Sequence, residues 1–250
     1  MIALITGASS GIGRDMAIAL SKQGYDLILV ARRKKRLEEL KKEVSTKVEI
    51  ITMDLSSTFN CVRLYHKVEK KPIDVLINNA GFGVFGPFNE TNLDKELDMI
   101  DTNVKALHVL TKLFLTDMKE RDQGYILNVA SSAAFFPGPL MASYYASKAY
   151  VLHLSEAICE ELRKEESNVS ISTLCPGPVD TEFNEVAGVH FGVKALTSEE
   201  VAQYAIKKMF QKKRVIVPGF TMKFVHTFSR FLPRKVLLNA TYGIQKKKEG

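Results

Sequence analysis

Short apolar runs alternate along the chain with segments in which apolar residues recur every three or four positions. Runs that are nearly all apolar are typical of strands buried on both faces, and the recurring pattern is typical of helices packed on one side. The predicted strands are Met1 to Ile5, Asp26 to Val30, Val48 to Thr52, Ile73 to Ile77, Tyr125 to Val129, Val169 to Leu174 and Val215 to Val217. The first predicted helix ends near Gly24, and the next are Lys34 to Val44, Thr58 to Lys70, Leu93 to Lys119 and Ser143 to Lys164. A capping box at Thr197 opens the last predicted helix, which runs to Phe210.

This alternation predicts an α/β fold, a doubly wound parallel sheet with helices on both faces, as in the Rossmann fold. Ligands in such folds lie outside the carboxyl ends of the strands, so residues directly after each strand are the functional candidates. The chain has 250 residues and no internal repeat or low-complexity linker. We therefore expect one domain, with residues 1–218 as the sheet-and-helix part and residues 219–250 as a short helical extension.

The composition is that of a folded protein, with 46% hydrophobic and 25% charged residues, and argues against disorder. The net charge of +7 gathers in basic clusters at Arg32 to Arg36, Lys212 to Arg214 and Lys246 to Lys248. Such clusters are usually solvated faces, and we expect no nucleic-acid partner.

The cysteines and histidines indicate neither disulfides nor a metal. The three cysteines are an odd number without a C-x-x-C pair, and the five histidines show no ligand spacing. The apolar start is too short for a secretion signal, and no run approaches the roughly 20 apolar residues of a membrane-spanning helix. We expect a cytoplasmic protein.

A glycine-rich turn follows the first strand, with Gly7, Gly11 and Gly13 in the run TGASSGIG. Glycines let the backbone turn sharply and approach a ligand closely, and the helix start that follows offers unpaired N–H groups at a positive dipole end. The spacing G-x-x-x-G-x-G is wider than the dehydrogenase fingerprint, and a turn that binds nothing is the alternative. Its position after the first strand of a βαβ unit favours a pyrophosphate.

The second strand runs into Arg32 and Arg33. Folds that bind NAD usually place an acid here to hold the ribose 2′-hydroxyl, whereas an arginine suits the 2′-phosphate of NADP. The alternative is that both arginines merely begin a charged surface helix. The position favours NADP as the cofactor.

Tyr144 and Lys148 lie four residues apart, so on a helix their side chains share a face. A nearby ammonium favours the phenolate, and we expect Lys148 to lower the pKa of Tyr144. Tyr145, three residues before Lys148, competes for this role, and a surface pair without function is the alternative.

Together, the glycine turn, the run Asn78-Asn79-Ala80-Gly81 and Tyr144-x-x-x-Lys148 resemble the short-chain dehydrogenase/reductase family, over residues 1 to about 218. The resemblance implies NADP(H) as cofactor, with Arg32 and Arg33 near the 2′-phosphate. It further implies that the phosphates, adenine, ribose and nicotinamide lie against Gly7, Ser9, Ser10, Gly11, Ile12, Gly13, Asp54, Leu55, Asn79, Ala80, Gly81, Tyr144, Lys148, Pro176, Gly177, Val179 and Thr181.

The resemblance also implies the catalytic residues Ser131, Tyr144, Lys148 and Asn103. Tyr144 is preferred to Tyr145 because the family's serine stands thirteen residues before the tyrosine, which here is Ser131. In the implied reaction, a reversible carbonyl reduction, Tyr144 donates the proton and Ser131 holds the oxyanion. Lys148 assists Tyr144, and Asn103 holds a water linked to the lysine.

Three segments are expected to form the substrate pocket: Phe82 to Phe88, Ala133 to Met141 and Thr181 to Leu196. They contain few charges, which indicates a hydrophobic ketone, aldehyde or alcohol, although core packing would also explain many of their aromatic residues. The candidate lining residues are Phe82, Val84, Phe85, Phe135, Phe136, Leu140, Met141, Phe183 and Phe191.

The extension departs from the minimal family pattern, with two short amphipathic helices broken at Pro233. We expect it to cap the pocket; pairing with another subunit and resting on a membrane surface are less favoured alternatives. By resemblance alone, a homodimer or homotetramer through helices such as Leu93 to Lys119 and Ser143 to Lys164 is expected.

Two rival functions are left open. A non-catalytic NADP-binding regulatory protein would keep the glycine turn but need none of the catalytic residues. An enzyme that uses the same site for epimerisation or dehydration would be expected to carry a longer substrate domain.

Overall fold

The computed structural model describes residues 1–183, 187 and 195–246. Phe191, a predicted pocket residue, lies outside these ranges. The central feature is a parallel sheet of seven strands in the order β3-β2-β1-β4-β5-β6-β9. Its strands are β1 (Ile2–Thr6), β2 (Asp26–Ala31), β3 (Val48–Thr52), β4 (Ile73–Asn78), β5 (Tyr125–Val129), β6 (Ser170–Leu174) and β9 (Val215–Ile216).

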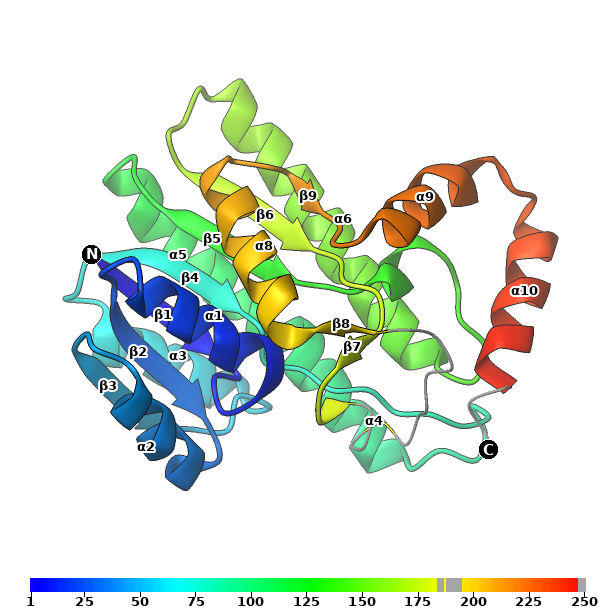
Figure 1. Ribbon diagram of the computed structural model, residues 1–250, viewed down its shortest axis with the longest axis horizontal. Coiled ribbons are helices and arrows are strands. Elements are labelled where there is room, and N and C mark those ends of the chain that lie inside the picture. Colours follow the sequence, from blue (N-terminus) through cyan, green and yellow to red (C-terminus); the bar gives the residue numbers. More distant parts are fainter. Residues whose placement is uncertain (184–186, 188–194, 247–250) are drawn as a thin grey trace.

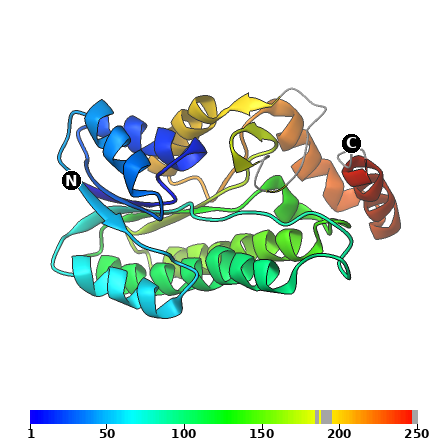
Figure 2. The same cartoon turned by 90° about the horizontal axis from the view of Figure 1, so that it is seen from below.

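Helices cover both faces of the sheet, as Figure 2 shows in side view. Successive strand residues point to opposite faces, so Ile5 packs with α1, α2 and α8 while Leu4 packs with α3, α5 and α6. These helices are α1 (Gly11–Ser21), α2 (Lys34–Glu43), α3 (Thr58–Val68), α5 (Leu107–Glu120), α6 (Ala142–Lys164) and α8 (Ser198–Phe210). The predicted doubly wound α/β fold is confirmed.

The predicted helix over Leu93 to Lys119 is continuous but not uniform. It consists of α4 (Leu93–Ile100), one wider π-helical turn η1 (Asp101–Ala106) and α5. Single π turns inside α-helices are frequent at functional sites, and this one carries Asn103. The predicted capping box is present, with Thr197 and Glu200 bonding each other's backbone.

Some short elements escape the hydrophobic pattern. The segment after β6 forms a two-stranded parallel sheet from β7 (Val179–Asp180) and β8 (Leu196–Thr197). A 3-10 turn, η2 (Ser132–Phe135), follows β5. Two-residue strands and single turns are too short for any periodicity to show.

The extension forms α9 (Phe220–Phe228), the turn η3 (Ser229–Phe231) and α10 (Arg234–Lys246). The two helices flank Pro233, as predicted. Figure 1 shows both, in orange and red, on the side of the molecule toward which the sheet strands point. Within the described ranges, no helix is both long and apolar enough to cross a bilayer.

Candidate active site

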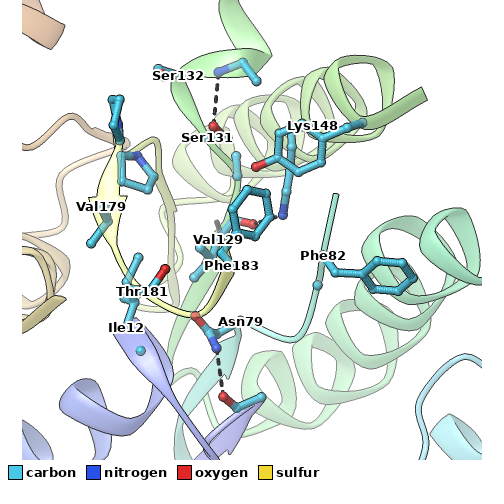
Figure 3. Close-up of a pocket in the computed structure, with 18 of the residues that line it drawn as sticks. Ile12, Asn79, Phe82, Val129, Ser131, Ser132, Lys148, Val179, Thr181 and Phe183 are labelled. Carbon is cyan, nitrogen blue, oxygen red and sulfur yellow. Dashed lines mark hydrogen bonds between the residues drawn. The ribbon is translucent and has the colours of Figure 1, made fainter. Parts of the chain in front are cut away.

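A cavity of about 1170 Å³ runs along the carboxyl ends of the strands. Its floor is the glycine turn, and its walls come from the ends of β2, β4, β5 and β6 and from the extension. Figure 3 shows Ile12 and Asn79 in the lower part and Ser131 and Lys148 above them. Among the predicted catalytic and cofactor-binding residues, Gly13 and Asn103 are the two that are not in its lining.

The glycine turn packs tightly against the end of β4. Gly7 has φ +65°, and a side chain at Gly13 would place its Cβ 2.3 Å from Asn79 Nδ2 and 2.6 Å from the Gly7 oxygen. Asn79 Nδ2 donates to the carbonyl oxygens of Thr6 (3.1 Å) and Gly7 (3.2 Å). Gly13 and Asn79 therefore hold the shape of the turn, because only a glycine fits beneath the amide.

The start of α1 offers a place for an anion. Ser10 is the N-cap residue, yet its hydroxyl makes no capping bond, so this side chain leaves the first N–H groups of α1 available to an anion. Arg33 Nη2 donates to Ser10 Oγ (2.7 Å) and Ser9 Oγ (3.1 Å). A guanidinium thus stands at the positive end of the helix.

The two candidate arginines lie differently. The side chain of Arg32 is 70% exposed and pairs only distantly with Asp54, at 3.9 Å. Arg33 instead bonds the serines of the turn and also Glu182, at 2.8 Å, which Arg36 contacts as well. Arg33 is therefore the arginine in direct contact with the glycine turn.

Ser131 and Tyr144 meet at the end of β5. Ser131 caps η2 by accepting a hydrogen bond from the Ala133 N–H (3.1 Å), and its side chain hydrogen-bonds with Tyr144. Burial raises the pKa of Tyr144 well above its ordinary value, and the bond with Ser131 opposes that rise. The lowered pKa predicted from the sequence is thus not found, because desolvation of the buried phenol is the larger effect.

Lys148 lies one turn further along α6 and is 5% exposed. Its Nζ donates to the Val129 carbonyl (2.9 Å) and lies 5.8 Å from the centre of the Tyr144 ring. Burial lowers the pKa of Lys148 to about 8. The ammonium is therefore close to neutralisation at mildly alkaline pH.

Asn103 is buried behind the pocket wall. Its Nδ2 donates to the Phe82 carbonyl (2.9 Å) and to Ser147 Oγ (3.1 Å), and its Oδ1 accepts from the Phe82 N–H (3.1 Å). A Cβ at Gly81 would lie 2.6 Å from Asn103 Oδ1 and 3.4 Å from Lys148 Nζ. Asn103 thus joins the loop after β4 to α6 beside Lys148.

Tyr145 also lines the cavity but has a different partner. Its hydroxyl accepts a hydrogen bond from Gln245 Nε2 of α10 (2.5 Å). Gln245 is fully buried, and its Oε1 has no hydrogen-bond partner among the described residues. The two neighbouring tyrosines therefore belong to different sets of contacts.

The segment after β6 closes the wall beside the glycine turn. Pro176, Gly177, Val179 and Thr181 line the cavity, and the Thr181 methyl would lie 3.1 Å from a Cβ at Gly11. The Pro176 carbonyl accepts from the Ser132 N–H (2.8 Å), which fixes this segment to the end of β5.

The substrate-side predictions divide into two groups. Phe82, Phe136, Met141 and Phe183 line the cavity. Val84, Phe85, Phe135 and Leu140 do not, and the first three pack in hydrophobic clusters instead.

The extension also lines the cavity, together with Tyr145. The residues of the extension that do so were not among the candidates predicted from the sequence: Phe220, Thr221, Met222, Val225, Thr241, Ile244 and Gln245. Their apolar spacing was visible, but nothing local shows which helix face meets the pocket.

A nicotinamide dinucleotide fits the donors of this cavity. The turn has positive φ at Gly7 and Gly11. A Cβ at Gly7 would lie 2.8 Å from Asn79 Nδ2 and 2.9 Å from Ala80 Cα, which leaves no room for a side chain there. The uncapped start of α1 and the Arg33 guanidinium suit phosphate groups. Polar and charged groups gather at this end of the cavity, and apolar residues dominate the other end.

Comparison with known proteins gives a consistent result. The family model described as short chain dehydrogenase matches residues 1–189. An uncharacterized oxidoreductase of Staphylococcus epidermidis is 31% identical over 89% of this chain and 96% of its own length. A very-long-chain 3-oxoacyl-CoA reductase of Phaeosphaeria nodorum is 38% identical over 64% of this chain, which spans half of that relative.

The solved structures agree in fold. A short-chain dehydrogenase from Sphingobium yanoikuyae in complex with NADPH has a TM-score of 0.83, is 28% identical, and matches over 94% of both chains. Another structure of this fold, a short chain dehydrogenase/reductase from Burkholderia phymatum, is in complex with NAD. Proteins similar to this chain therefore bind one or the other nicotinamide dinucleotide.

Proposed function

The chain belongs to the short-chain dehydrogenase family of oxidoreductases, and from this premise we propose that it interconverts a hydrophobic ketone or aldehyde and its alcohol with NADP(H). One observation carries the proposal. Ser131, Tyr144 and Lys148 converge on a cavity that is continuous with the glycine turn at one end and mostly apolar at the other.

The proposed NADP preference rests on the arginines. Arg33 supplies a guanidinium held by Ser9 and Ser10, and Arg32 adds a second charge at the same cavity edge. The start of α1 would receive the pyrophosphate, and Asp54 and Leu55 would flank the adenine. When bound, the cofactor supplies or accepts a hydride.

Tyr144 acts as the general acid in the proposed reduction. The Tyr144 hydroxyl, whose pKa is raised by burial, carries a proton at neutral pH. It can give this proton to the developing alkoxide because an alkoxide is the stronger base. Ser131, which bonds the same hydroxyl, donates to the substrate oxygen and stabilises its negative charge.

Lys148 and Asn103 support the proton transfer. The Lys148 ammonium stabilises the phenolate that Tyr144 becomes after it has given its proton. Asn103 positions the loop after β4 beside Lys148 through its bonds to Phe82. We propose that Asn103 helps to hold a water linked to Lys148, through which the proton of Tyr144 is resupplied.

The proposed substrate is largely apolar, because the far end of the cavity is lined by Phe136, Met141, Phe183 and residues of α9 and α10. One relative is named for its substrate, a very-long-chain 3-oxoacyl-CoA, and this substrate contains a carbonyl next to a long hydrocarbon chain. A carbonyl on a long apolar body is therefore the first class to test.

We also propose a homo-oligomer. Leu93 and Leu97 on α4 and Tyr150 on α6 are exposed apolar residues on the helices expected to pair. Light scattering of the wild type and of Leu97→Glu should show an oligomer that the substitution dissociates.

The deciding experiment follows oxidation of NADPH and of NADH against a panel of hydrophobic ketones and aldehydes. We expect turnover that favours NADPH and falls by about 10²- to 10⁴-fold in Tyr144→Phe. Tyr145→Phe is the matched control, because it removes a hydroxyl from the same cavity and should leave kcat largely unchanged. Full activity in Tyr144→Phe would contradict the catalytic assignment. NADPH binding without turnover on any carbonyl would favour a regulatory protein instead.

A further inference from the structure

The extension presents an unusual surface of exposed aromatic and aliphatic side chains. Phe220 is 85% exposed, Phe231 79% and Phe224 53%, and α9 contains no buried residue. Exposed residues continue through η3 and α10 with Leu232, Val236, Tyr242 and Ile244. Many exposed apolar side chains gathered in one short segment of a folded protein indicate a site of interaction.

The charges of the same segment are all of one sign. The chain has 28 acidic residues, but none of them falls within residues 219–246. That segment carries Lys223, Arg230, Arg234, Lys235 and Lys246. Among the described residues, neither Arg234 nor Lys235 has an acidic partner. Within the described part of the chain, no carboxylate therefore neutralises these two charges, which lie in the same segment as the exposed aromatic side chains.

The combination of exposed apolar side chains with positive charges distinguishes between two kinds of binding partner, a lipid bilayer and a second copy of this chain. The buried centres of protein interfaces are depleted in lysine, which this segment carries three times, whereas helices that lie in a membrane interface combine Phe and Leu with Lys and Arg. Basic residues near a bilayer surface are attracted to anionic lipids. The surface therefore suits an anionic bilayer better than a second copy of this chain.

We propose that α9, η3 and α10 form a membrane-docking surface that binds anionic phospholipid bilayers without crossing them. The docking surface adjoins the active-site cavity, because Phe220, Met222 and Val225 of α9 and Ile244 of α10 line that cavity. If the proposed function holds, docking brings the apolar end of the cavity close to the lipid phase from which hydrophobic substrates come. The docking itself does not depend on that function.

The test is sedimentation of the full chain with vesicles of phosphatidylcholine alone and of phosphatidylcholine mixed equally with phosphatidylglycerol. Neither substrate nor cofactor is needed, so failure of the proposed function would not affect the result. We expect binding to the anionic vesicles only, weakening as salt is raised.

Two double variants probe the docking surface, Phe224→Ser with Phe231→Ser and Arg234→Gln with Lys235→Gln. Each should weaken binding at least about tenfold. The matched controls are Phe59→Ser, an exposed phenylalanine on α3, and Lys41→Gln with Lys42→Gln on α2. These should change binding by less than about twofold. Thermal unfolding of every variant verifies the fold, and the charge variant keeps the test valid if the aromatic one misfolds.

Three results would overturn the proposal. One is no sedimentation with either vesicle. Another is equal loss in the α2 control, which would assign binding to general basic charge. The third is an oligomer that Phe224→Ser with Phe231→Ser dissociates while vesicle binding is absent, which would assign the surface to a second copy.

Discussion

The two ends of the cavity are built in different ways. At the glycine-turn end, backbone groups and short polar side chains interlock, as in the bonds of Asn79 to Thr6 and Gly7. At the helical end, side chains of α9 and α10 form the wall, and Tyr145 and Gln245 make a polar contact across it. The first end is bound to the sheet, and the second rests on helices with little buried surface.

This difference predicts where changes are tolerated. A turn locked by backbone hydrogen bonds cannot accept an added atom without moving a strand end. A wall of exposed helices can shift with a smaller loss of contacts. We therefore expect substitutions at the glycine-turn end to affect folding and cofactor binding, and substitutions at the helical end to affect substrate binding with only small changes in stability.

The largest effect is expected at Lys148, where the two ends meet. The pKa of Lys148 is lowered from 10.5 to about 8 in the fold, so the unfolded chain binds more protons between these pH values. The free energy of unfolding of the wild type, relative to Lys148→Met, should rise by up to about 3 kcal/mol from pH 8 to pH 10.5. Denaturant unfolding across this pH range measures the difference.

The same variant should be almost inactive at every pH, because the phenolate of Tyr144 loses its cation. A pH-independent difference in stability between the two proteins would show that Lys148 is not desolvated as the structure indicates.

Gly13→Ala should distort the glycine turn. Its Cβ would lie 2.3 Å from Asn79 Nδ2, and we expect a loss of about 1–3 kcal/mol in stability together with weaker NADPH binding. Thermal unfolding and fluorescence titration with NADPH measure both quantities.

The matched control at the helical end is Gly243→Ala. Nothing lies within 4 Å of a Cβ at Gly243, which is inside α10, so alanine should stabilise that helix by about 0.5–1 kcal/mol. If Gly13→Ala and Gly243→Ala destabilised the protein equally, the two ends of the cavity would not differ in their tolerance of substitutions.

The smallest effect is expected for Gln245→Leu. It removes the hydrogen bond to the Tyr145 hydroxyl, which is worth about 1 kcal/mol, so the KM for a ketone substrate should rise roughly fivefold. The affinity for NADPH should stay unchanged, since Gln245 is at the helical end. A parallel loss of NADPH affinity would mean that α10 supports the whole cavity.

Several features could be predicted from the sequence because their causes are local. The sheet and its helices follow from apolar runs and three-to-four-residue spacing, and the capping box at Thr197 lies within four residues. The glycine turn could be located for the same reason. Its steric basis, the contact of Gly13 with Asn79 on β4, could not.

Other features depend on neighbours that are distant in the chain. The motif alone did not show that Arg33, rather than Arg32, bonds the turn serines. Asn103 was expected in an ordinary helix, yet it lies buried on a π turn and bonds the backbone of Phe82. The direction of the Tyr144 pKa shift was wrong, because the i, i+4 spacing shows the cation but not the extent of burial.

The sequence by itself determined the α/β class, the strand-turn-helix that begins the fold, and the pair Tyr144 and Lys148, since each rests on residue types at short, fixed spacing. Ser131 followed only from the resemblance to the family. Only the tertiary structure decided which apolar residues line the cavity, how deeply Tyr144 and Lys148 are buried, and that α9 and α10 supply the helical end. The reason is physical: desolvation and packing depend on every neighbour in space, and most of those neighbours are far away along the chain.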